Sequence, residues 1–182
     1  MDVYILKPDT NRFQNLICIG EDYVDWLQKF DGSSLASSWE PLAVQVFYEE
    51  ENLPASDYPS LALHIPVFSK RATLALKEAL DKHGELLSLL CGDGEYYAYN
   101  VTCVLDILNE EKSTLVRFSS GRTLNIEDYS FNSADLGDYP IFKLPQTLLR
   151  GVFVTQAFKQ KVEESGLTGF TFKFIGNGLP LN

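Results

Sequence analysis

The 182-residue sequence has few of the side chains that most often carry catalysis or bind metals, with three cysteines and two histidines. It also lacks long hydrophobic runs. The apolar stretch 61–67 is interrupted by His64 and Pro66 and is far shorter than the ~20 residues of a membrane-spanning helix. No basic segment followed by an apolar block stands near the first methionine. We therefore expect a cytoplasmic protein that does not bind membranes.

The cysteines Cys18, Cys91 and Cys103 are odd in number, widely spaced and set among apolar residues. This pattern is typical of small buried side chains and argues against disulfides. A cysteine nucleophile needs a nearby base, and only His64 and His83 could supply an imidazole. We therefore predict no catalytic residue.

Metal and cofactor motifs are also missing. The consecutive carboxylates of Glu49, Glu50 and Glu51 would alternate between the two faces of a strand, so they cannot converge on one ion by themselves. The glycine pairs at 92–94 and 176–178 do not have the spacing of phosphate-binding loops. The sequence predicts no metal site and no cofactor.

Negative charge is concentrated at the front of the chain. The formal net charge is −10, and residues 1–60 alone hold eleven acidic and three basic residues. Residues 121–182 hold six of each and are neutral. An acidic surface repels nucleic acid and attracts basic proteins, although charge of this kind can also serve only to solvate a surface.

Aromatic residues stand beside these acids, and the combination suggests a partner-binding face, in which aromatics anchor and charges steer. The alternative is that Tyr23 and Trp26 belong to the core side of an amphipathic helix whose acids face solvent. The candidate partner-binding residues are Asp22, Tyr23, Asp25, Trp26, Tyr48, Glu49, Glu50, Glu51 and Asp57.

Periodicity predicts an α+β fold, with one mainly antiparallel sheet and two principal helices packed against it. The helices are expected at 69–83 and 155–165, and the sheet should include 96–101 and 169–175. A further short helical stretch is expected at 104–108. Without a break in composition, we expect one domain spanning 1–182, with an acidic front third at 1–60.

The segment EESGLTGFTFKFIG near the end of the chain shows a helix exit followed by an alternating strand. Gly166 should end the helix, and Phe170, Phe172 and Phe174 then share one face. We interpret this strand as one that completes the core.

Several short motifs follow one another in a characteristic order: Trp39-Glu40-Pro41, the PVFSKRA segment at 66–72, the YYAYNVT segment at 96–102 and the GLTGF segment at 166–170. In this order the chain resembles a bacterial family once described only as a domain of unknown function and later grouped with the immunity proteins of polymorphic toxin systems. The resemblance implies a non-enzymatic protein that binds and neutralises a cognate secreted toxin. It assigns no catalytic residue.

Two classes of function therefore stand side by side. The first is an acidic inhibitor that covers a surface of a basic toxin. The second is a small enzyme or ligand-binding protein with a pocket at the sheet. The acidic front and the missing catalytic set favour the inhibitor.

Overall fold

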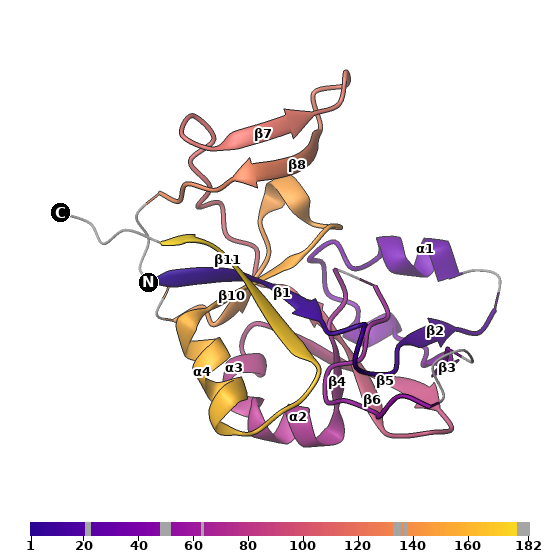
Figure 1. Cartoon of the computed structure of the whole chain (residues 1–182). Helices are drawn as coiled ribbons and strands as arrows, with labels where there is room; N and C mark the ends of the chain where they lie inside the picture. The colour runs from indigo at the N-terminus through magenta and orange to yellow at the C-terminus, as the bar shows by residue number, and fades with distance from the viewer. Residues whose placement is uncertain (21–22, 48–51, 63, 133–135, 137, 178–182) are drawn as a thin grey trace.

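The computed structural model describes residues 1–20, 23–47, 52–62, 64–132, 136 and 138–177. Within these ranges the chain is mostly β, with eleven strands in three sheets and four short α-helices (Figure 1). The predicted α+β fold with two principal helices on one sheet is therefore wrong. Local periodicity located helical segments within 69–83 and 155–165 and strands at 96–101 and 169–175, but it could not show that the strands divide among three sheets.

The first sheet has four antiparallel strands in the order β11-β1-β10-β9. Its strands are β1 (Asp2–Pro8), β9 (Ile141–Phe142), β10 (Val152–Thr155) and β11 (Phe170–Asn177). The N-terminal strand thus lies inside the sheet between two strands from the end of the chain. The sheet cannot be completed until almost the whole chain is present.

The second sheet has five strands in the order β2-β3-β5-β6-β4. They are β2 (Leu16–Cys18), β3 (Leu42–Val46), β4 (Val67–Ser69), β5 (Gly84–Cys91) and β6 (Tyr96–Val101). The pair β3 and β5 is parallel, and the other pairs are antiparallel. Strands β6 and β11, which we expected in one sheet, therefore belong to two different sheets.

The third sheet is the two-stranded pair β7 (Thr114–Arg117) and β8 (Thr123–Asp128), which projects at one end of the molecule (Figure 1). Residues 104–108, predicted as a helix, are extended instead. Val104 forms a parallel bridge with Lys143, and Leu108 forms an antiparallel bridge with Phe131. The segment therefore pairs with other segments of the same chain instead of forming the helix that its apolar spacing predicts.

The helices are shorter than predicted. They are α1 (Tyr23–Gln28), α2 (Lys70–Ala75), α3 (Lys77–Leu80) and α4 (Gln156–Glu164). The expected helix at 69–83 is divided at Leu76, which ends α2 and precedes α3. Among the described residues, no helix has both the length and the apolarity needed to cross a membrane.

Three hydrophobic clusters hold these layers together. The first lies between the four-stranded sheet and strands β4 and β6, and α2, α3 and α4 contribute to it. The second places α1 on strands β3, β5 and β6. The third packs β8 and the extended 105–108 segment on the other face of the four-stranded sheet. Tyr4 and Leu6 of β1 enter the first cluster while Val3 enters the third, as strand alternation requires.

The end of the chain follows the predicted geometry in part. Gly166 has a φ of +60°, and the amide of Leu167 donates to the carbonyl of Val162, which is the hydrogen bond of a Schellman helix end. Phe170 and Phe172 are half-buried against the first cluster, whereas Phe174 is 54% exposed. Two of the three aromatic rings therefore complete the core.

Candidate partner-binding surfaces

Among the predicted partner-binding acids, Asp25 lies on α1 with its carboxylate exposed to solvent. Asp22, Tyr48 and the run Glu49, Glu50 and Glu51 lie outside the described residues. Tyr23 begins α1, but its side chain also lies outside the description. Asp25 is therefore the predicted steering charge that the structure places on an accessible surface.

Trp26 faces the interior. Its ring centroid lies 4.8 Å from that of Phe30 and 5.5 Å from that of Trp39, within the second cluster. The ring is buried because α1 packs its apolar side on the five-stranded sheet. In the free protein Trp26 is a core residue rather than an exposed anchor.

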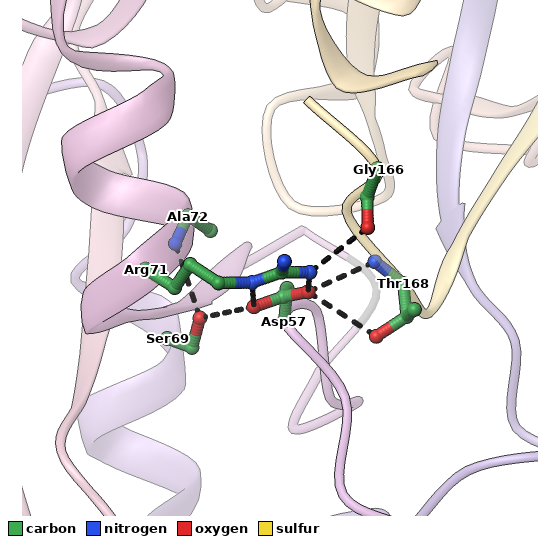
Figure 2. A network of polar contacts seen from close by, with 6 residues as sticks. All are labelled: Asp57, Ser69, Arg71, Ala72, Gly166 and Thr168. Carbon is green, nitrogen blue, oxygen red and sulfur yellow. Dashed lines mark hydrogen bonds and ion pairs between the residues drawn. The ribbon is translucent and has the colours of Figure 1, made fainter. Parts of the chain in front are cut away.

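Asp57 is also buried and sits at the centre of a polar network (Figure 2). Its carboxylate accepts two hydrogen bonds from the Arg71 guanidinium, at 3.0 Å from Nε and 2.5 Å from Nη2. The Ser69 hydroxyl donates to it at 2.7 Å, and the Thr168 amide at 2.9 Å. Ser69 Oγ in turn accepts from the Ala72 amide, and so caps α2.

This network sets the charge state of Asp57. Burial alone would raise the pKa of the carboxyl. The hydrogen bonds from Arg71, Thr168 and Ser69 favour the ionised form more strongly and lower its pKa to about 2. The carboxylate is therefore ionised under all ordinary conditions.

The network joins three segments that are far apart in the sequence. Asp57 lies in the loop before β4, Arg71 in α2, and Thr168 between α4 and β11. Arg71 also donates to the carbonyl of Gly166 at 2.9 Å. Asp57 thus fastens the end of the chain to the second sheet, a role that its position in a Pro-rich acidic loop did not reveal.

The same junction explains why glycine stands at position 169. Its φ is +86°, and a Cβ there would lie 2.5 Å from the Ser56 hydroxyl oxygen. A side chain would therefore push the loop that carries Asp57 away from the end of the chain.

The amide of Cys103 donates to the carbonyl of His83 at 3.1 Å, so this cysteine and this histidine are neighbours. All three cysteines are free and half-buried, and burial raises the pKa of the Cys18 and Cys103 thiols, which keeps them protonated. The His64 Nε2 lies 2.9 Å from the carbonyl oxygen of Leu27, and burial lowers the pKa of His64.

Lys143 is an interior cation that the sequence analysis missed. Its side chain is fully buried, and its ammonium donates to the carbonyl of Phe30. Burial lowers the pKa of Lys143 to about 8, although the nearby Asp31 carboxylate favours the charged form. The lysine ties the end of β9 to the segment after α1. Its neighbours Ile141, Phe142 and Leu144 gave the only sequence signal, since they predict an inaccessible strand.

Residues 92–177 match the model of an immunity protein family (Imm11). The matched stretch begins at the turn between β5 and β6 and ends with β11. This match confirms the resemblance to immunity proteins, and such a family suggests a role in toxin immunity. Among curated proteins, none matches this chain.

Proposed function

We propose that this protein is an immunity protein that binds a cognate secreted toxin in the cytoplasm and neutralises it by direct contact. The match of residues 92–177 to an immunity family carries the proposal. We further propose that the whole chain acts as one binding domain and that inhibition needs neither catalysis nor a cofactor.

The charge distribution supports a basic partner. Residues 1–60 hold eight more acidic than basic residues, and Asp25 is exposed on α1. Such a field accelerates encounter with a basic protein and repels nucleic acid and anionic lipid. We propose that Asp25 and the acids at 22 and 49–51 steer the toxin, with Tyr23 and Tyr48 beside them.

The test is protection by co-expression. The toxin to test is the C-terminal domain of a large secreted protein, if one is encoded upstream of this gene. It should stop growth when expressed alone, and this chain should restore growth and co-purify with it. An unrelated immunity protein of similar charge is the control and should not protect. Failure of both protection and co-purification with a toxic upstream domain would contradict the proposal.

A further inference from the structure

Two adjoining hollows lie where β8 and the chain after β9 cover the four-stranded sheet. The first has a volume of about 380 Å³ and is lined by residues of β1, β8 and β11, including Lys7 and Lys173. The second, of about 580 Å³, lies between the β7–β8 turn and residues 145–150. Thr147 and Arg150 line both, so the two hollows form one continuous surface, called here the hairpin groove.

The hairpin groove is basic on a strongly acidic protein. Five cations line it against two acids, Asp31 and Glu127. One of the cations, Arg117, is paired with Glu110. The other four form no ion pair within the part of the chain that the structure describes: Lys7, Arg122, Arg150 and Lys173.

Two of these cations flank an exposed aromatic ring. The guanidinium carbons of Arg122 and Arg150 lie 5.8 Å and 6.0 Å from the ring centroid of Phe118. Phe118 is 42% exposed, and Leu149 in the same groove is 43% exposed. The cation–π contacts hold the guanidinium groups in place while leaving their N–H groups free to donate.

A buried hydroxyl also lacks a partner there. Thr147, which lines both hollows, is 6% exposed, and its Oγ1 makes no hydrogen bond to any described residue. A buried hydroxyl without a partner costs free energy.

From these observations we infer that the hairpin groove is a docking surface for an acidic, partly apolar segment of the cognate toxin. The inference rests on the proposed function and adds a second contact of opposite charge to the acidic front. Carboxylates of the segment would accept hydrogen bonds from Arg122 and Arg150. Its apolar side chains would cover Phe118 and Leu149, which a free inorganic anion would leave exposed.

Two contacts of opposite charge would give specificity as well as affinity. A toxin must then present basic and acidic patches in a matching arrangement, and a toxin with only one of them is rejected. Asp31, three residues after the end of α1, lines the second hollow, so the hairpin groove reaches the segment that follows α1, although the β7–β8 hairpin itself lies apart from α1 (Figure 1).

The experiment measures the affinity of the purified toxin domain for two charge-matched variants. The groove variant carries Arg122→Glu and Arg150→Glu. The control carries Lys77→Glu in α3 and Lys161→Glu in α4, at the end of the molecule away from the β7–β8 hairpin. Both variants change the formal charge equally. We expect a loss of affinity of roughly 30-fold or more for the groove variant and less than about threefold for the control.

Each result has a distinct meaning. Equal losses in both variants, or no loss in the groove variant, would overturn the docking inference while leaving the immunity function standing. No binding of the toxin by the unmodified protein would overturn the proposed function itself. A thermal-shift titration with inorganic phosphate is the second measurement. If phosphate stabilises the unmodified protein but not the groove variant, and the groove variant still binds the toxin as tightly as the unmodified protein, then the groove binds a small anion. That result would overturn the docking inference.

Discussion

At the scale of single residues, Asp57 is a charged side chain that is buried and holds parts of the fold together. An isolated buried carboxylate is strongly unfavourable, and the site compensates with the Arg71 guanidinium, a hydroxyl and a backbone amide. Arg71 itself remains partly exposed, with 57% of its side chain accessible. Loss of Asp57 would therefore free Arg71 to solvent without leaving a buried, unpaired cation.

We predict that Asp57→Asn lowers the free energy of unfolding at pH 7 by about 2 kcal/mol, from the fall of its pKa from 3.8 to about 2. Because the folded-state pKa is the lower one, ionised Asp57 stabilises the fold fully above about pH 4. That contribution is lost as the pH falls towards 2. Urea unfolding at pH 7 and at pH 3 measures the difference.

Asp25→Asn is the matched control, because Asp25 is an exposed carboxylate near the same end of the sequence. We expect its effect on stability to stay within about 0.5 kcal/mol at both pH values. Equal losses for the two variants, or a loss for Asp57→Asn that does not shrink at low pH, would show that the network is not the cause.

At the scale of elements, β11 is an edge strand, and the burial of its aromatic side chains decreases along its length. The first half of the strand packs on the core through two aromatic contacts. The ring centroid of Phe170 lies 4.6 Å from that of Tyr58 in a stacked arrangement, and Phe172 packs edge-on against Tyr4. The second half of the strand carries Phe174, which contacts the Tyr4 ring edge-on but is largely exposed to solvent. The strand therefore both closes the core and leaves an aromatic ring at the surface.

We predict that Phe172→Ala destabilises the protein by about 2 kcal/mol, less than a fully buried phenylalanine would, because its ring is only half-buried. Phe174→Ala should cost under about 1 kcal/mol. Thermal and urea unfolding of both variants test the difference. A larger loss from Phe174→Ala would mean that the outer end of β11 contributes more to the core than its exposure indicates.

At the scale of the whole molecule, charge separates the front of the chain from the hairpin groove. Under the proposed function, the net charge of −10 acts on a basic toxin during the approach, whereas the groove cations act on its acidic segment once the two proteins are in contact. Both fields are screened beyond about 10 Å at ordinary salt concentrations. Salt should therefore weaken mainly the long-range step, which is the rate of encounter.

We predict that reversing Asp25, Glu49 and Glu50 to lysine slows association with the toxin by roughly tenfold or more at low salt and much less near 0.5 M salt. Stopped-flow association at several salt concentrations is the measurement. The melting temperature should stay close to that of the unmodified protein. Asp57 is left out of this set because its reversal would disrupt the network around Arg71.

An unchanged association rate at low salt would remove the acidic front from the binding mechanism. The hairpin groove, which lies largely in the electrically neutral last third of the sequence, would then be the principal contact surface.

The sequence by itself determined the features that depend on neighbouring residues. Periodicity located the strands at 96–101 and 169–175, Gly166 marked a helix end, and the order of short motifs indicated an immunity family. Each of these signals acts over a few residues, or over the order of motifs, and needs no knowledge of distant contacts.

Only the tertiary structure decided which sheet each strand joins and which charges are buried. β1 pairs with β11, and Asp57 meets Thr168, across more than a hundred residues of intervening chain. Strand pairing and carboxylate burial depend on the packing of such distant segments, which periodicity does not encode. For the same reason, dispersed cations such as Lys7, Arg122 and Lys173 became one basic groove only when the chain folded.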